Sequence, residues 1–247
     1  MSELHDSVRA WWDRDASTYD ASVGHAASDP TEAAAWRAVL TSLLPPAPAR
    51  VLDVGAGTGA MSLLAAELGH EVTGLDLSES MLERARAKAS QRGVDVTFVH
   101  GRAEEPPSGP FDAVVERHVA WTLPDPVGAF RAWRAATEPG GRLVLLEGSW
   151  AGEGPWVVVQ DALAAALRRL RGLGEDHHAE YPPEILERLP LRGVTSPMPF
   201  VRAVDEAGWT RVQVIRLRDV EWAIELRDGW PLGWLTRRPR YAIVADA

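Results

Sequence analysis

Residues 51–59 read Val51-Leu52-Asp53-Val54-Gly55-Ala56-Gly57-Thr58-Gly59, an apolar strand that runs into a turn with three glycines. Glycine adopts positive φ without steric cost and lets a backbone approach a ligand closely. The helix that we predict over residues 59–68 would present its first N–H groups, which have no partner within the helix. The stretch therefore predicts a loop at a sheet edge that holds a nucleotide-like ligand.

Outward from this loop, short apolar segments alternate with helical ones. Strands are predicted over residues 50–54, 71–75, 94–99, 111–115, 142–146, 211–217 and 240–245. Helices are predicted over residues 4–22, 31–44, 59–68, 78–91, 127–137, 155–171 and 199–207. Ser78 is the predicted N-cap of the helix over residues 78–91. Residues 139–141 are a turn, and residues 219–238 receive no assignment. Such alternation is typical of βαβ units. We therefore expect an α/β fold, with a Rossmann-like, seven-stranded, mostly parallel sheet and helices on both faces.

Composition narrows the class of protein. The chain has 247 residues, a net charge of -9 and no cysteine, so disulfides and thiolate metal sites are excluded. Nucleic-acid-binding proteins usually present a basic face, which argues against a nucleic-acid partner. The first residues lack the features of a signal peptide, and no apolar run reaches about 18 residues. We expect a cytoplasmic protein without a membrane partner, as a monomer or a homodimer.

Two ligands fit the glycine loop. Gly55, Gly57 and Ala60 satisfy the dinucleotide pattern, and Asp76 follows at the distance of a ribose-binding acid. Asp53 favours a different ligand, because a carboxylate at the end of a buried strand is costly unless it is paired. A cationic ligand would pair with it, whereas a pyrophosphate would be repelled.

Several motifs in order resemble class I S-adenosylmethionine-dependent methyltransferases of the small-molecule, ubiquinone/menaquinone-methyltransferase-like type. The resemblance covers residues 10–147 strongly and the rest loosely. Its motifs are Asp53–Gly59, Leu75-Asp76-Leu77-Ser78, Ser80–Ala85, Phe111–Val115, Glu138–Leu143 and the segment from Trp12 to Asp20. The resemblance implies S-adenosylmethionine as cofactor and S-adenosylhomocysteine as product.

The resemblance also implies which residues bind this cofactor. They are Trp12, Tyr19, Asp53, Gly55, Ala56, Gly57, Gly59, Asp76, Leu77, Met81, Ala103, Glu104 and Glu116. One position departs from the family: Arg102 stands where an aspartate often bonds the adenine amino group. Adenine would then be held by the Ala103 amide or by Glu104.

By the same resemblance the chain is one methyltransferase domain, residues 1–247. Residues 1–44 form an N-terminal helical lid, residues 50–147 the cofactor-binding core, residues 148–198 a substrate-cap insertion between strands five and six, and residues 199–247 the last strands. Loops beyond the carboxyl ends of the strands are where such sheets bind ligands.

Methyl transfer requires mainly alignment of donor and acceptor, so a catalytic residue need not exist. His118 is the best candidate for a general base, because histidine titrates near neutrality; a structural histidine is the alternative, and His25 is a weaker candidate base. The expected acceptor pocket comprises Arg117, His118, Trp121, Trp150, His177, His178 and Tyr181. No metal site is expected, because adjacent histidines in a strand point to opposite faces.

The acceptor is expected to be a small molecule. The chain lacks the Asn/Asp-Pro-Pro-Tyr run of enzymes that methylate amino groups of adenine or glutamine, and it lacks the cysteine of cytosine-carbon methyltransferases. The chain has eleven tryptophans, which either line a pocket for a flat substrate or fill core space. The Trp-rich tail and the insertion are expected to shape a pocket for an aromatic or heterocyclic acceptor. The composition and the resemblance together suggest bacterial secondary metabolism. Two alternatives stay open: a nicotinamide-dependent oxidoreductase, and a non-methylating binding protein on the same fold.

Overall fold

A computed structural model describes residues 2–21, 27–148, 155–172 and 181–247 of the chain. The strands are β1 Arg50–Val54, β2 Glu71–Asp76, β3 Val96–His100, β4 Phe111–Arg117, β5 Thr137–Gly148, β6 Thr210–Arg216 and β7 Arg240–Asp246. The helices are α1 Ser2–Asp15, η1 Tyr19–Ala21, α2 Pro30–Leu43, α3 Ala60–Glu67, α4 Glu79–Arg92, η2 Ala120–Thr122, α5 Pro126–Ala135, α6 Pro155–Leu170, α7 Pro183–Leu186, α8 Met198–Glu206, α9 Arg218–Asp228 and α10 Leu232–Thr236.

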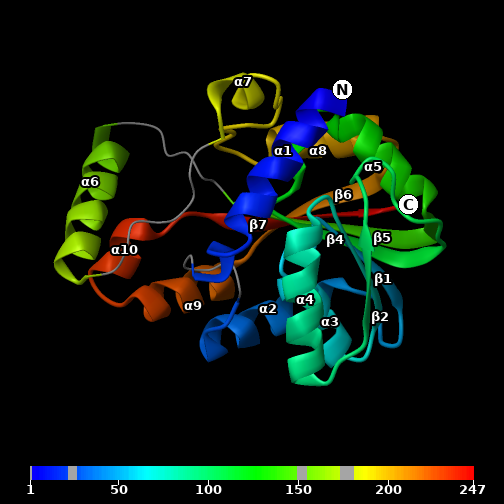
Figure 1. Cartoon of the computed structure of the whole chain (residues 1–247), viewed down its shortest axis with the longest axis horizontal. Coiled ribbons are helices and arrows are strands. Elements are labelled where there is room, and N and C mark those ends of the chain that lie inside the picture. Colours follow the sequence, from blue (N-terminus) through cyan, green and yellow to red (C-terminus); the bar gives the residue numbers. More distant parts are fainter. Residues whose placement is uncertain (1, 22–26, 149–154, 173–180) are drawn as a thin grey trace.

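The strands form one sheet in the order β3-β2-β1-β4-β5-β7-β6 (Figure 1). Neighbouring strands from β3 to β5 are parallel, whereas β7 runs antiparallel to both β5 and β6. The predicted seven-stranded, mostly parallel sheet is therefore confirmed. The strand order reverses at β1, which lies between β2 and β4, and such a switch point opens a crevice at the carboxyl ends of the strands.

Local sequence explains where the elements near this crevice begin and end. The Asp29 carboxylate caps α2 by accepting hydrogen bonds from the backbone N–H groups of Thr31 and Glu32, both at 2.9 Å. Ser78 is the predicted N-cap of α4: its Oγ accepts from the Met81 N–H at 3.2 Å. That cap holds the start of α4 directly behind the end of β2.

Both faces of the sheet are covered by apolar packing. On one face, Trp36 and Leu40 of α2 pack with α3, α9 and the inward side chains of β1, β4, β5 and β7. On the other face, Phe130 and Trp133 of α5 pack with Phe200 of α8. The central strands are nearly continuous apolar runs, as expected for a parallel sheet that is buried on both faces.

The structure corrects several predicted boundaries. The first helix ends at Asp15 rather than residue 22, because Thr18 N–H closes a turn on the Asp15 carbonyl at 2.9 Å. The predicted turn at residues 139–141 lies inside β5, where the register of β4 and β5 shifts. The unassigned residues 219–238 contain α10 and all of α9 except its first residue, Arg218.

The described residues between β5 and β6 include two helices, α6 and α7, that pack in different places. Ala164 of α6 packs against Leu232 and Leu235 of α10, beside the main body (Figure 1). The α7 region instead packs against α1, where Tyr181 and Ile185 share an apolar cluster with Leu4 and Trp11. In the described part of this segment, α6 is therefore a side layer, and α7 supports the N-terminal helix.

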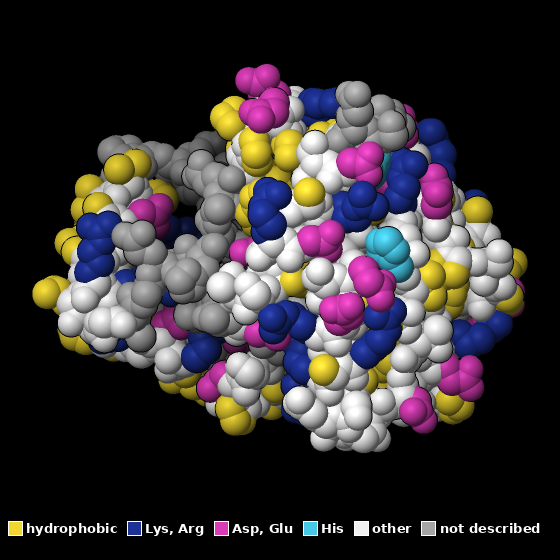
Figure 2. Space-filling view, in the orientation of Figure 1, with side chains coloured by type: hydrophobic (Ala, Val, Ile, Leu, Met, Phe, Trp, Pro, Cys, Tyr) yellow, Lys and Arg dark blue, Asp and Glu magenta, His cyan; other side chains and the backbone are white. Residues whose placement is uncertain are grey.

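In the described residues, no helix is long and apolar enough to cross a membrane. Over the same residues, no three histidine, aspartate or glutamate side chains gather as a metal site. Basic and acidic side chains are interspersed over the face that Figure 2 presents.

Candidate functional site

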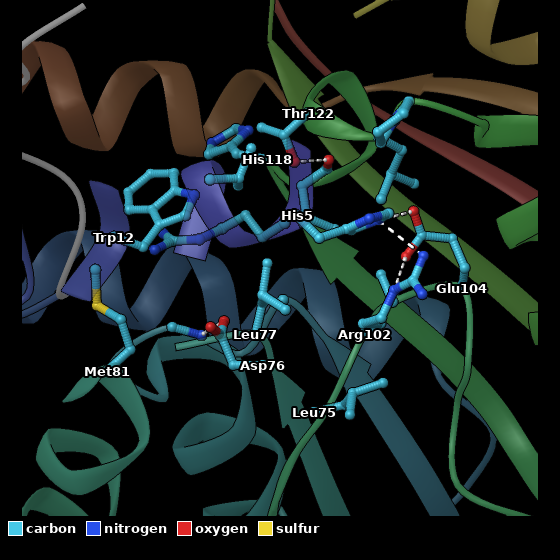
Figure 3. Close-up of a pocket in the computed structure, with 18 of the residues that line it drawn as sticks. His5, Trp12, Leu75, Asp76, Leu77, Met81, Arg102, Glu104, His118 and Thr122 are labelled. Atoms are coloured by element: carbon cyan, nitrogen blue, oxygen red, sulfur yellow. Dashed lines mark hydrogen bonds and ion pairs between the residues drawn. The ribbon is translucent and has the colours of Figure 1, made fainter. Parts of the chain in front are cut away.

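A cleft of about 800 Å³, its open mouth included, lies at the carboxyl ends of β1, β2 and β4, beneath α1 (Figure 3). Core residues of the glycine loop and of the β2 and β3 ends form one wall, and residues of α1 and η1 form the other. The described lining residues include His5, Val8, Trp12, Tyr19, Gly55, Gly57, Leu75, Asp76, Leu77, Met81, Arg102, Ala103, Glu104, Arg117, His118, Val119, Thr122 and Leu123.

Asp76, at the end of β2, is fixed by the backbone. Its Oδ2 accepts from the Gly57 N–H and its Oδ1 accepts from the Ser78 N–H, both at 2.8 Å. Burial raises the pKa of Asp76, while these two N–H groups oppose the rise. Each carboxylate oxygen can accept a second hydrogen bond. Asp76 can therefore hold the vicinal hydroxyls of a ribose in the cleft.

The glycine loop is tightly packed at Gly55, whose φ is +68°. A Cβ at this position would lie 2.6 Å from the Val119 Cβ, so only glycine fits. The Gly55 and Ala56 N–H groups both donate to the Leu75 carbonyl, at 2.8 and 3.0 Å. These contacts join the ends of β1 and β2 and set the floor of the cleft.

The N-terminal segment is fastened across the cleft by side-chain contacts. The Ser78 hydroxyl donates to Asp13 of α1 at 2.6 Å. The Thr58 hydroxyl donates to Asp20 of η1 at 2.6 Å, and Lys88 of α4 forms an ion pair with Asp20 at 3.0 Å. These contacts hold α1 and η1 against the glycine loop and α4, and the closure of this segment over a cofactor stays a prediction.

Asp53, near the end of β1, lies in a separate small recess beside the glycine loop. The Ser62 hydroxyl donates to its Oδ2, and burial raises the pKa of Asp53 to about 6. The nearby positive charge of Arg117 partly offsets that rise. Asp53 and Arg117 line a small recess with Tyr19 and Ala56. The buried carboxylate thus has partners within the protein, which the sequence argument for a cationic ligand did not foresee.

His118 follows β4 and has a φ of +65°, which is uncommon for a residue with a side chain. Its Nε2 lies 3.1 Å from Nη1 of Arg240, on β7. Its Nδ1 lies 3.5 Å from Oε2 of Glu147, near the end of β5. His118 also lines the cleft, so side chains from β5 and β7 contact a histidine that follows β4 at the cleft wall.

Glu116, which was expected among the cofactor-binding residues, is held by backbone groups of the protein. It is fully buried, and its Oε2 accepts from the N–H groups of Val119 and Ala120 at 2.8 and 3.1 Å. It does not line the cleft. Burial raises the pKa of Glu116 to about 8. Burial and the charge of Glu116 also raise the pKa of the neighbouring Glu147 well above its usual value.

Most predicted cofactor residues line the cleft, and two of the predicted acceptor residues, Trp121 and Tyr181, do not. Tyr181 is buried against Trp11, with ring centroids 4.7 Å apart, and Trp121 packs beside it at 5.8 Å. Neither is among the described residues that line the cleft, because both pack in the apolar cluster that α1 forms with the α7 region. Gly59, in the left-handed conformation, is the N-cap of α3. His25, Trp150, His177 and His178 lie outside the described residues.

Three functional candidates were missed from the sequence: His5, Glu147 and Arg240. His5 and Arg240 lie 99 and 122 residues from the partners that bring them to the site, Glu104 and His118. Glu147 was predictable in part, since a carboxylate at the end of a buried apolar strand needs a partner.

Residues 52–145 match the family described as "Methyltransferase domain". A "Ubiquinone biosynthesis O-methyltransferase" of Xanthomonas axonopodis pv. citri (strain 306) is 32% identical over 73% of this chain and 68% of its own length. A protein of the same name from Xanthomonas campestris pv. campestris (strain B100) is 32% identical over 70% and 64%. The matched part of the chain thus spans about two thirds of the length of these relatives.

Among solved structures, a geranyl diphosphate methyltransferase in complex with GPP and sinefungin has a similar fold. The TM-score is 0.59 at 17% sequence identity, over 86% of this chain and 78% of that one. At this identity the similarity concerns the fold alone.

Proposed function

This chain belongs to the class I S-adenosylmethionine-dependent methyltransferases that act on small molecules, and from that premise we propose that it methylates a hydroxyl group of an aromatic or heterocyclic metabolite. S-adenosylmethionine, when bound, supplies an electrophilic methyl group. The relatives named as O-methyltransferases support oxygen as the acceptor atom. Their substrates are those of longer proteins, so the identity of the acceptor is part of this proposal.

The observation that carries the proposal is His118 on the wall of the cleft that Asp76 also lines. A hydroxyl must lose its proton when its oxygen is methylated, and a positioned base contributes about 10²–10⁴-fold to such a step. We propose that His118 accepts this proton. In the overall reaction the acceptor O–H bond and the S–CH₃ bond of the cofactor break, and an O–CH₃ bond forms. S-adenosylhomocysteine leaves, and the proton passes through His118 to solvent.

The cleft residues suit the cofactor. Asp76 offers acceptor positions for ribose hydroxyls, and Leu75, Leu77 and Val8 offer apolar surface for a flat base. Trp12 and Tyr19 belong to the segment fastened across the cleft, so they would help to exclude water from the reacting methyl group. Excluding water and aligning donor with acceptor account for much of the expected rate enhancement.

Calorimetric titration of the full chain with S-adenosylmethionine, S-adenosylhomocysteine and NADH tests the proposal first. We expect both sulfur compounds to bind and NADH not to bind. Asp76→Ala should weaken binding by about 10- to 100-fold, as for loss of hydrogen bonds to a charged group. Glu71→Ala is the matched control, because Glu71 is exposed at the opposite end of the same strand.

The second stage supplies labelled S-adenosylmethionine with phenols and hydroxylated heterocycles. Label recovered in an ether product supports the proposal. Label in an N-methyl or C-methyl product would contradict the choice of oxygen. Binding of the cofactor without transfer to any acceptor would favour a non-methylating protein on this fold, and binding of NADH alone would overturn the proposal.

A further inference from the structure

The guanidinium of Arg240 occupies the position that an acceptor hydroxyl needs. Its Nη1 lies 3.1 Å from Nε2 of His118, and a guanidinium only donates hydrogen bonds, so it takes up the lone pair of this nitrogen. His118 lines the cleft (Figure 3) and is the base of the proposed reaction. A hydroxyl can give its proton to His118 only after the guanidinium has left Nε2. A suitable acceptor must therefore offer this guanidinium a better partner than the imidazole.

The guanidinium can leave Nε2 while the backbone of Arg240 stays in place. Arg240 lies opposite Gly148 in the register of β7 with β5. Its N–H donates to the Glu221 carboxylate at 2.9 Å, and its carbonyl accepts from the Leu217 N–H at 2.8 Å. These contacts hold the main chain on both sides. Movement of the guanidinium then needs only a change of side-chain rotamer.

The surroundings of this guanidinium favour an anion. Burial, and next the positive charge of Arg117, lower the pKa of Arg240 to about 10. Arg117 lines the cleft, and its guanidinium carbon lies 5.5 Å from the ring centroid of Trp36. Burial and a neighbouring like charge both disfavour a cation, and a bound anion offsets both effects. An acceptor with a negative charge would therefore be attracted to this end of the cleft.

The described acids around this guanidinium are either paired with other arginines or uncharged. Glu32 forms an ion pair with Arg227, and Glu221 forms one with Arg216 at 2.9 Å. Burial raises the pKa of Glu147 well above its ordinary value, so this carboxyl group holds its proton near neutral pH. The positive charge at this place thus stays available to a ligand.

We propose that the acceptor carries a carboxylate on the ring atom next to its reactive hydroxyl, and that Arg240 binds this carboxylate and leaves Nε2 of His118 to the hydroxyl. A guanidinium binds a carboxylate through two parallel charge-assisted hydrogen bonds, which are stronger than one bond to a neutral imidazole. The two acceptor groups must lie close together, because the atoms that bind them are 3.1 Å apart. Substituents on neighbouring ring atoms meet this condition. The inference rests on the proposed function, because it names the substrate class of the same site.

A matched pair of a charged and a neutral ligand tests the inference. The probes are 2-hydroxybenzoate and 2-hydroxybenzamide, which have the same shape but differ in charge. Each is titrated into the full chain saturated with S-adenosylhomocysteine and labelled with ¹³C at histidine Cε1. The NMR signal of His118 is identified by its loss in His118→Gln. We expect the acid to shift this signal and to bind about 10- to 100-fold more tightly than the amide, as for hydrogen bonds to a charged group.

Variants of Arg240 show whether this preference comes from its guanidinium. Arg240→Gln should reduce the ratio of the two dissociation constants to below about threefold, since the charge is gone. Arg240→Lys should give an intermediate ratio, because an ammonium keeps the charge but not the two parallel N–H groups. Arg237→Gln is the matched control: Arg237 is an exposed arginine of the same segment, lies 3.7 Å from Glu225, and should leave the ratio unchanged.

The affinity for S-adenosylhomocysteine reports whether each variant is folded, because Arg240 is not among the described residues that line the cleft. If Arg240→Gln is unfolded, Arg240→Lys decides: a ratio at least about threefold below the wild type supports the inference, and an unchanged ratio overturns it. A wild-type ratio in Arg240→Gln also overturns it.

The same titration with acid and amide pairs of hydroxylated heterocycles extends the test beyond one ring. Equal affinities of acid and amide in the wild type would overturn the inference, and so would the absence of binding by every acid in the set. The proposed function would stand in these cases if neutral phenols were methylated. If the wild type bound no S-adenosylhomocysteine at all, the proposed function itself would fail.

Discussion

The Nη1 atom of Arg240 lies 3.1 Å from Nε2 of His118. A guanidinium can only donate, so this contact puts a lone pair on Nε2 and the imidazole proton on Nδ1. Nδ1 lies on the side of Glu147, whose Oε2 is 3.5 Å away. Arg240 of β7 therefore fixes the neutral tautomer of His118, and an acceptor hydroxyl must take the place of this guanidinium at Nε2 for His118 to act as a base.

The variant His118→Gln tests whether His118 acts as the general base. We expect kcat for methyl transfer to a phenolic acceptor to fall about 10²- to 10⁴-fold, as for loss of a general base. The affinity for S-adenosylhomocysteine should stay within about threefold of the wild type, because His118 is assigned to the acceptor. Single-turnover kinetics and calorimetry check the two parts. An unchanged kcat would make His118 a structural histidine, the alternative that the sequence left open.

The sequence predicts those parts of the site whose contacts join residues close together in the chain. The glycine loop, Asp76 and the cap by Ser78 depend on residues close together in the chain, and all were predicted. His118 was predicted as a candidate, but its partner Arg240 comes from the last strand, and no pattern within one segment indicates such a contact. Tyr181 was expected in the acceptor pocket, yet tertiary packing puts it under α1 against Trp11.

The buried acid Glu116 should make stability depend on pH. Its pKa is raised to about 8, so the folded protein holds a proton that the unfolded chain releases above its ordinary pKa of 4.5. The folded state then binds more protons between these values, and the free energy of unfolding falls as pH rises through that window. Glu147, whose pKa is also raised, adds to the same trend.

Glu116→Gln should flatten this dependence, because glutamine keeps an oxygen for the Val119 and Ala120 N–H groups and carries no charge. Thermal unfolding from pH 5.5 to 8.0 measures it: we expect a smaller fall in Tm than in the wild type. Glu206→Gln, an exposed carboxylate on α8, is the control and should follow the wild type. A Glu116→Gln profile parallel to the wild type would contradict the assignment.

Two glycines with similar φ allow the cost of a left-handed backbone to be measured separately from the cost of a steric clash. Gly55 and Gly93 have φ of +68° and +65°, but a Cβ at Gly93 meets nothing within 4 Å, whereas at Gly55 it meets Val119 at 2.6 Å. Gly93→Ala should cost about 1–2 kcal/mol of unfolding free energy, the cost of a left-handed residue. Gly55→Ala should cost about 1–3 kcal/mol more.

Chemical denaturation measures both values, and Gly55→Ala combined with Val119→Ala supplies the control. The double variant should recover part of the additional loss, because it removes the two Val119 Cγ atoms that lie 2.7 and 3.0 Å from the new Cβ. Equal losses for the two single variants would mean that the loop relaxes away from Val119, and the tight packing of Gly55 would not limit the cleft floor.

Lys88 is the only lysine in the chain, which makes it a specific reporter of the N-terminal segment. Its side chain is 19% exposed and forms an ion pair with Asp20 of η1 at 3.0 Å. Burial lowers the pKa of Lys88, so access rather than protonation should limit acylation. If the segment must open to admit the cofactor, the rate of acylation reports that opening.

We expect saturating S-adenosylhomocysteine to slow acylation of Lys88 several-fold, since a filled cleft holds the segment closed by mass action. Mass spectrometry of the Lys88 peptide measures the rate. Asp20→Ala should accelerate labelling without ligand, whereas Glu79→Ala, which removes an exposed acid paired with Arg86 on the same helix, should not. An identical rate with and without S-adenosylhomocysteine would mean that the cofactor enters without moving η1, and the contacts of Asp20 would then serve stability alone.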